Sequence, residues 1–266
     1  MTTTPDDLLA ADLARRAGAV LLEVRESTGD ADPAALRAAG DRASHEFLVA
    51  ELARLAPADA VLSEEGADDP ARLAADRVWI VDPLDGTREF SERHADGTWR
   101  DDWAVHVALW VRGRGLVAGA VALPGRDVVL ATPTTPTREP SRGTRLRLAV
   151  SRSRPPALVQ RLVELADVEL VPMGSAGVKA TSVVTGVCDA YVHAGGQYEW
   201  DSAAPVAVAV AAGLHCSRID GSPLEYNQPN PWLPDLIVCE HARSAELLDL
   251  VARAQRTEPA KETAAP

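Results

Sequence analysis

Hydrophobic positions in the first part of the chain change their spacing more than once. Over residues 6–25 they recur every three or four positions, which predicts an amphipathic helix. The mixed stretch 27–40 is expected to be a loop, and helical spacing over residues 41–56 predicts a second helix. The short apolar run 60–62 then indicates a strand, which leads into the polar sequence Ser63-Glu-Glu-Gly66.

Longer apolar runs follow and predict a sheet. Residues 78–81 form a β-branched run typical of a buried strand, and Pro83 should end its hydrogen-bonded ladder because proline has no N–H. The runs 103–111, 116–123 and 127–131 are separated by turns that contain glycine or proline. We therefore expect three antiparallel strands here.

Two polar stretches interrupt this pattern. Residues 91–101 are expected to form an exposed, mobile loop that can act as a lid. After residues 132–143, which are rich in Thr, Pro and Arg, strands and helices alternate as in α/β proteins. The predicted order is strand 147–150, helix 155–166, strand 168–171, helix 174–184, strand 189–193, helix 201–213, strand 236–239 and helix 245–254.

Composition and net charge limit the classes of partner that this chain can bind. Hydrophobic residues make up 46% and charged residues 25% of 266 residues, as in soluble globular proteins. A net charge of −12 argues against a nucleic-acid polymer or an anionic membrane as partner. A small anionic substrate remains compatible, since bound cations can invert the local field.

The cysteine residues and the first residues of the chain indicate the cellular compartment to expect. Cys188, Cys216 and Cys239 form no C-x-x-C pair and lie among apolar residues, so we expect small core residues in a reducing environment. The acidic start of the chain is unlike a signal peptide, and the longest apolar stretch, 203–214, is too short to span a bilayer. We therefore expect a cytoplasmic protein.

The candidate chemistry lies where the 78–81 strand ends. Asp82 and Asp85 follow that strand on one turn, Gly86 supplies a sharp backbone bend, and Thr87 is a candidate cap for a following helix. Divalent cations prefer carboxylate oxygens, and phosphate oxygens prefer free N–H groups. Asp-Pro and Asp-Gly pairs are also ordinary turn residues, so this stretch alone does not decide between a solvated turn and a metal site.

Two further acidic elements support the metal site. Glu64 and Glu65 follow the 60–62 strand, and Asp201 begins a predicted helix. Taken alone, a glutamate pair is commonly a polar loop. If these carboxylates converge, however, their repulsion nearly requires cations, and Mg²⁺ suits a site made only of oxygens.

The motifs Asp82-Pro-Leu-Asp85-Gly-Thr87 and Trp200-Asp-Ser-Ala-Ala204 resemble the inositol monophosphatase superfamily of Mg²⁺-dependent, lithium-sensitive phosphatases. The resemblance extends from Asp41 to the last predicted strand. The chain is most similar to the 3′(2′),5′-bisphosphate nucleotidase branch, which removes the 3′-phosphate of 3′-phosphoadenosine 5′-phosphate. The features that point to this branch are residues 85–90, 199–204 and 221–227.

The resemblance implies a layered αβαβα fold with two lobes, and two or three Mg²⁺ ions. The first ion is expected on Glu65, Asp82 and the Leu84 carbonyl, and the second on Asp82, Asp85 and Asp201. A third, weaker ion would be held by Glu65 through water. The boundaries expected are 1–140 for an N-terminal α+β lobe with the main metal site, 141–256 for an α/β lobe with substrate contacts and Asp201, and 257–266 for a tail.

The resemblance also implies a reaction. Water bound to a metal ion would attack phosphorus in line, without a phosphoenzyme. Asp41 matches an aspartate near this water, Thr87 would orient it, and the N–H groups of Gly86 and Thr87 would hold the phosphate. The superfamily often has Lys and then Val-Thr just before the Asp41 position, whereas this chain has Leu36-Arg-Ala-Ala-Gly40, so Arg37 is a candidate substitute.

Five residues are candidate substrate contacts: Ser175, Lys179, His193, Glu199 and Tyr226. Ser175 and Lys179 match a nucleotide-contacting stretch, but a helix cap and a solvated lysine explain them equally well. His193 stands where the branch often has Arg, and a plain strand histidine is the alternative. Tyr226 either flanks an adenine or packs on the lobe surface.

The sequence is compatible with three functions. The first is hydrolysis of 3′-phosphoadenosine 5′-phosphate to AMP and phosphate, which clears a by-product of sulfate activation. The second is an inositol monophosphatase or a fructose-1,6-bisphosphatase-type sugar phosphatase, because the carboxylates contact only the ester phosphate. The third is a non-catalytic metal or nucleotide sensor. A homodimer is compatible with the resemblance, but the sequence locates no interface.

Overall fold

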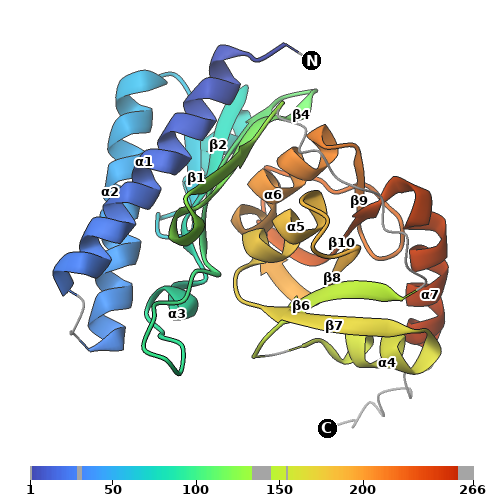
Figure 1. Cartoon of the computed structure of the whole chain (residues 1–266). Helices are drawn as coiled ribbons and strands as arrows, with labels where there is room; N and C mark the ends of the chain where they lie inside the picture. Colours follow the sequence, from blue (N-terminus) through green and yellow to red (C-terminus); the bar gives the residue numbers. More distant parts are fainter. Residues whose placement is uncertain (1, 29–31, 134–144, 154, 257–266) are drawn as a thin grey trace, which may run out of the picture.

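The structure is a computed structural model that describes residues 2–28, 32–133, 145–153 and 155–256 (Figure 1). Two five-stranded sheets lie between layers of helices. The first half contains α1 (Pro5–Thr28), α2 (Pro33–Leu55), β1 (Ala60–Ser63), η1 (Pro70–Ala74), β2 (Arg77–Asp85), α3 (Thr87–Phe90), β3 (Ala104–Val111), β4 (Gly115–Leu123), η2 (Pro124–Arg126) and β5 (Val128–Ala131). The second half contains β6 (Leu146–Ser151), α4 (Ala157–Leu165), β7 (Val168–Met173), α5 (Ala176–Val184), β8 (Ala190–Tyr198), α6 (Glu199–Ala211), β9 (Leu214–Ser217), β10 (Trp232–Glu240), η3 (His241–Arg243) and α7 (Ser244–Arg256).

The first sheet has the order β1-β2-β3-β4-β5, with β1 and β2 parallel and the other neighbours antiparallel. Successive side chains of a strand point to opposite faces, and β2 is apolar on both. Trp79 and Val81 pack in the core under α1 and α2, while Val78 and Ile80 pack in the core shared with α5 and α6. The continuous apolar run of β2 therefore reflects burial on both faces.

The second sheet has the order β7-β6-β8-β10-β9. Strand β6 is parallel to both β7 and β8, whereas β10 is antiparallel to β8 and β9. Helices α4 and α7 cover one face through a third core, and α5 and α6 lie between the two sheets. The layers are thus α1/α2, sheet, α5/α6, sheet and α4/α7, which confirms the predicted αβαβα fold.

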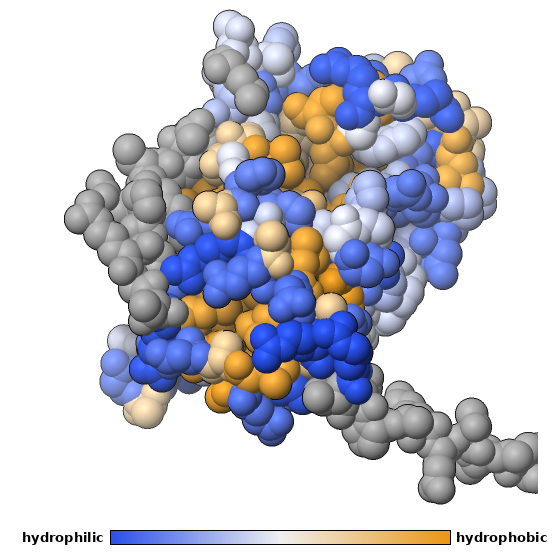
Figure 2. All heavy atoms as spheres, turned by 90° about the vertical axis from the view of Figure 1, so that its right-hand side faces the viewer, coloured by the Kyte–Doolittle hydropathy of each residue, from blue (hydrophilic) through white to orange (hydrophobic). Residues whose placement is uncertain are grey.

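Hydrophobic and hydrophilic residues are mixed on the outer surface of the second lobe (Figure 2). Figure 2 shows the face that lies to the right in Figure 1, where hydrophobic side chains occupy hollows between hydrophilic ones. In the described part of the chain, no helix combines the length and the apolar character needed to cross a membrane.

Several predicted elements need correction. The stretch 27–40 is wrong as a loop, since α2 begins at Pro33. Asp32 caps this helix by accepting from the N–H groups of Ala34 and Ala35, and proline suits the first turn. Strand β9 (Leu214–Ser217) was not predicted, because it follows the helix directly and its four residues are too short a run for their apolar–polar alternation to indicate a strand.

The turn at the end of β2 also differs from expectation. Pro83 does not end the strand, because the pairing with β3 is irregular between Asp82 and Asp85 and resumes at Asp85 opposite Ala104. The missing N–H of proline falls in this irregular step. Thr87 is the first residue of α3 rather than its cap, and Gly86 precedes it with a positive φ of 88°.

The boundary expected near residue 140 lies outside the described residues, as does the tail 257–266. Within 91–101 a bridge joins Arg93 to Trp99, and the predicted mobility of this loop stays a prediction.

Candidate metal centre and active site

Three carboxylates from two lobes meet at one point. Asp82 and Asp85 come from the end of β2, and Asp201 comes from the first turn of α6. One carboxylate oxygen of each lies within 4.8 Å of the others. The irregular step in β2 brings both of its aspartates to this edge of the sheet.

Asp82 lies deepest. Its Oδ1 accepts from the Leu84 N–H at 3.1 Å, while its buried Oδ2 has no hydrogen-bond partner among the described residues. Burial, followed by the charges of Glu64, Asp85 and Asp201, raises the pKa of Asp82 well above its usual value. A buried carboxylate oxygen without a partner is costly. The site therefore fits a cation, and its donors are all oxygens.

Asp85 is held by the N-terminus of α5. The Ser175 hydroxyl donates to its carboxylate, and the N–H groups of Ala176 and Gly177 donate at 3.1 and 2.6 Å. Gly177 is required here, since a Cβ at this position would lie 2.1 Å from Nε2 of His106. The sequence Gly174-Ser-Ala-Gly177 thus allows a helix end of one lobe to reach the metal centre of the other.

His106 on β3 completes this arrangement, and sequence reasoning missed it. Its Nε2 lies 3.1 Å from Asp85 Oδ2, and its Nδ1 donates to the Trp200 carbonyl at 3.0 Å. Burial lowers the pKa of His106, but Asp85 outweighs burial and the net shift is upward. Burial alone would raise the pKa of Asp85, yet the His106 charge keeps it below its usual value. The sequence feature that could have indicated His106 is a single polar residue within an otherwise apolar strand.

The two glutamates after β1 face different groups. Glu64 is an exposed residue whose carboxyl is hydrogen-bonded to Asp82, and burial of this carboxyl followed by the Asp201 charge raises its pKa to about 7. Glu65 instead acts on Asp41, whose pKa is raised to about 6 by burial and then by Glu65. The sequence favoured Glu65 as the ligand of the first metal, whereas the structure places Glu64 beside Asp82.

Asp41 and Thr87 lie close together, as the resemblance implies. A hydrogen bond with Thr87 lowers the pKa of Asp41 against the raising effects of burial and of Glu65, and Arg37 lowers it further. The Thr87 hydroxyl also lies 3.1 Å from the Leu84 carbonyl, and its single proton can serve either this carbonyl or Asp41. The Arg37 guanidinium donates to the Ser91 hydroxyl at 3.2 Å, so it reaches the end of α3.

The five predicted substrate contacts are already engaged within the protein. Ser175 holds Asp85, and buried Lys179 donates to the carbonyls of Gly174 and Ser175, each at 2.7 Å. His193 Nε2 lies 2.8 Å from the Gly196 carbonyl. Lys179 is therefore not the solvated lysine considered as an alternative, and the other assignments stay predictions.

Glu199 and Arg72 fasten one loop from two sides. The Glu199 carboxylate accepts from the N–H groups of Asn227 and Gln228 at 2.6 and 2.8 Å. Buried Arg72 donates to Asn227 Oδ1 at 2.7 Å and to the Gln228 carbonyl at 2.9 Å, and it pairs with Asp68. This loop thus joins η1, which follows Glu64 in sequence, to the first turn of α6.

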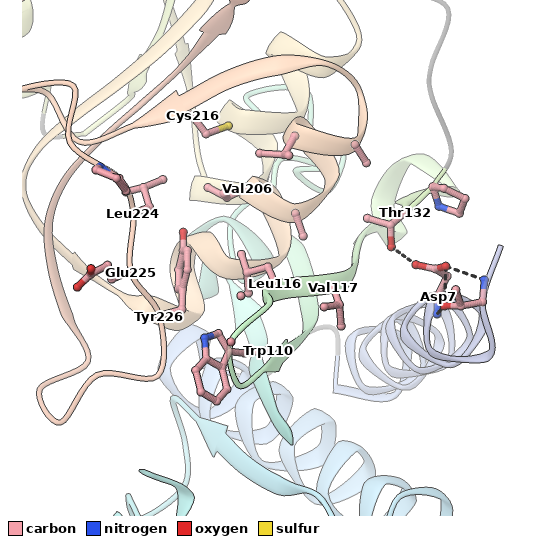
Figure 3. Close-up of a pocket in the computed structure, with 18 of the residues that line it drawn as sticks. Asp7, Trp110, Leu116, Val117, Thr132, Val206, Cys216, Leu224, Glu225 and Tyr226 are labelled. Carbon is pink, nitrogen blue, oxygen red and sulfur yellow. Dashed lines mark hydrogen bonds between the residues drawn. The ribbon is translucent and has the colours of Figure 1, made fainter. Parts of the chain in front are cut away.

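A well-formed groove among the described residues lies away from this site (Figure 3). It is a groove of about 780 Å³ between the β3–β4 turn, α6 and the loop before β10, and it contains none of the metal-site carboxylates. Tyr226 lines it, and its hydroxyl lies 3.1 Å from Ser202 Oγ. The described lining includes Asp7 and Glu225 but no Lys or Arg, so the groove does not suit a phosphate ester.

Comparisons with known proteins agree with this geometry. The chain is 50% identical over 257 residues to the "3′-phosphoadenosine 5′-phosphate phosphatase" of Mycobacterium leprae, covering 92% of this chain and 93% of that protein. It is 32% identical to the "3′(2′),5′-bisphosphate nucleotidase CysQ" of Escherichia coli K12, with 83% and 94% covered. The crystal structure of CysQ from Bacteroides thetaiotaomicron superposes with a TM-score of 0.72 at 29% identity, with 88% and 96% covered. The profile of the inositol monophosphatase family matches residues 5–259, and this chain therefore belongs to that family.

Proposed function

We propose that this chain is a Mg²⁺-dependent phosphomonoesterase that hydrolyses the 3′-phosphate of 3′-phosphoadenosine 5′-phosphate to AMP and phosphate, and so clears a by-product of sulfate activation. The observation that carries the proposal is the meeting of Asp82, Asp85 and Asp201 around the buried Oδ2 of Asp82, to which no described residue donates a hydrogen bond. The names of the relatives at 50% and 32% identity support the choice of substrate.

The donor set suits Mg²⁺, a hard cation that prefers oxygen ligands. Asp82, Asp85, Asp201 and the Leu84 carbonyl are the proposed ligands, and the placement of Glu64 beside Asp82 adds Glu64 to the set. Glu65 stays a candidate for a weaker site next to Asp41. When bound, the ions neutralise phosphate charge and lower the pKa of a water molecule.

Residues of the chain accept the proton, orient the water and bind the phosphate. Asp41 accepts a proton from the attacking water, because a carboxyl with a pKa of about 6 is largely ionised at neutral pH. Thr87, which is hydrogen-bonded to Asp41, orients that water. The N–H groups of Gly86 and Thr87 bind the phosphate where the positive φ of Gly86 turns the backbone. The reaction needs mainly placement and charge neutralisation, which these groups provide.

A substrate panel tests the proposal. Initial rates would be measured with 3′-phosphoadenosine 5′-phosphate, inositol 1-phosphate and fructose 1,6-bisphosphate, with Mg²⁺ and with EDTA. We expect a clear preference for the nucleotide and no turnover in EDTA. A preference for the sugar phosphates would refute the nucleotidase assignment in favour of a broader sugar phosphatase. Absence of Mg²⁺-dependent phosphate release from every substrate would support a non-catalytic sensor.

A further inference from the structure

Three aromatic side chains form a cluster next to the metal-site carboxylates. Tyr198 stacks on Trp200 with ring centroids 4.7 Å apart and an interplanar angle of 10°. Trp232 meets Tyr198 edge to face at 5.3 Å and 81°. We name these three residues the aromatic platform. Tyr198 and Trp232 are 41% and 44% exposed, so the platform presents ring surface to solvent.

The platform is fixed by the sheet beneath it. Trp232 begins β10 directly opposite Tyr198, the last residue of β8, so the two side chains rise on the same face. Gly196 has a φ of 91°, and a Cβ there would lie 1.7 Å from Cζ2 of Trp232. Only glycine therefore lets the Trp232 ring lie against β8. The Glu199 N–H also donates to the Pro231 carbonyl at 2.8 Å, which anchors the chain just before Trp232.

The platform adjoins the metal centre through the backbone. The Tyr198 N–H donates to Asp201 Oδ2 at 2.6 Å, and the Trp200 carbonyl accepts from His106, which contacts Asp85. These two contacts put the backbone of Tyr198 and Trp200 directly against the carboxylates that would hold the phosphate. In a nucleoside 3′-phosphate, base and phosphate are attached to the same ribose, so the base stays close to the phosphate.

We propose that the aromatic platform stacks the nucleobase of the substrate, and this proposal rests on the proposed function. A base has a π-face that matches an aromatic ring, whereas a polyol needs hydrogen-bond donors and acceptors that these rings mostly lack. The platform contains no charged side chain, which suits a neutral purine. It therefore supplies the preference for a nucleotide that the carboxylates, which contact only phosphate, do not supply.

The test separates base recognition from phosphate chemistry. Tyr198→Ala and Trp232→Ala would be compared with the conservative Tyr198→Phe and Trp232→Phe. Val210→Ser is the matched control, since Val210 is 56% exposed at the other end of α6. For each protein, kcat and KM would be measured with 3′-phosphoadenosine 5′-phosphate and with inositol 1-phosphate. Binding of AMP would be measured by calorimetry, and mass by size-exclusion chromatography with light scattering.

Stacking of one base is worth about 1–3 kcal/mol, so each alanine variant should raise the nucleotide KM roughly 5- to 150-fold and weaken AMP binding similarly. We expect kcat, and every constant for inositol 1-phosphate, to change less than twofold. The phenylalanine variants should retain near-normal values, as should the control.

Three outcomes would overturn the proposal. Equal losses on both substrates would indicate a structural role, and unchanged AMP affinity would exclude stacking. A dimer that becomes a monomer in Trp232→Ala, with unchanged nucleotide KM, would assign the platform to contact between two copies of the chain. If the wild-type protein hydrolyses only sugar phosphates, the proposed function fails, and AMP binding still decides separately whether the platform stacks a base.

Discussion

Removal of the Arg72 guanidinium should weaken both the fold and the metal centre. The Arg72 side chain is 1% exposed. In Arg72→Met the hydrogen bonds to Asn227 Oδ1 and to the Gln228 carbonyl are lost, because methionine has no donor. The buried Asn227 acceptor left without a donor costs about 1–3 kcal/mol, and the Gln228 carbonyl, which is only partly buried, costs at most as much. The partly exposed Asp68 regains water and adds little.

The two acceptors together give a loss of about 1–6 kcal/mol in the free energy of unfolding. In a protein of this size each kcal/mol lowers Tm by about 2–4 °C, so Tm should fall by roughly 2–24 °C. Urea unfolding and calorimetry would measure both. The exposed Arg54, which pairs only with Glu51 among the described residues, provides the control Arg54→Met, with an expected change within about 0.5 kcal/mol.

Arg72 should also affect metal binding, because the loop it fastens is held by Glu199, two residues before Asp201. We expect the half-saturating Mg²⁺ concentration to rise several-fold in Arg72→Met, with kcat at saturating Mg²⁺ retained within about threefold. A loss of stability below about 1 kcal/mol would refute the assignment of buried acceptors. An unchanged Mg²⁺ requirement would refute the link between this loop and α6.

Three further predictions follow from the site. Asp85→Asn should stay folded but lose most phosphatase activity, because the amide keeps one acceptor for the α5 N–H groups and loses the charge; near-normal turnover at saturating Mg²⁺ would contradict its role. Gly177→Ala should lower Tm and activity, because the added Cβ would lie 2.1 Å from His106 Nε2 and overpacking costs about 1–3 kcal/mol. An unchanged Tm and unchanged rates would exclude this close approach. In EDTA, stability should fall as pH rises from about 4 to 7, because the pKa values of Glu64 and Asp201 are raised to about 7 and about 6 and folding therefore favours their protonated forms. Melting curves at pH 5 and 8 in EDTA would measure this loss of stability, and added Mg²⁺ should reverse it. A rise in Tm with pH in EDTA would contradict the repulsion between the carboxylates.

The sequence by itself determined most helices and strands and the three aspartates of the candidate site, whereas the layered fold was expected from the resemblance to the inositol monophosphatase superfamily. Apolar periodicity indicated most helices and strands, because it reflects which face of an element is buried. The continuous apolar run at residues 78–81 indicated a strand covered on both faces. Asp82, Asp85 and Asp201 were recognisable because carboxylates at strand ends and helix starts have a direct chemical meaning.

Only the tertiary structure decided how the surrounding side chains are used. Adjacent residues after a strand point in different directions, and the resemblance favoured Glu65 where the structure places Glu64 beside Asp82. His106 gains its role from α5 and α6 of the other lobe, and Arg72 from a loop 155 positions away. Periodicity encodes local backbone and burial, whereas these partners are fixed by the packing of one lobe against the other.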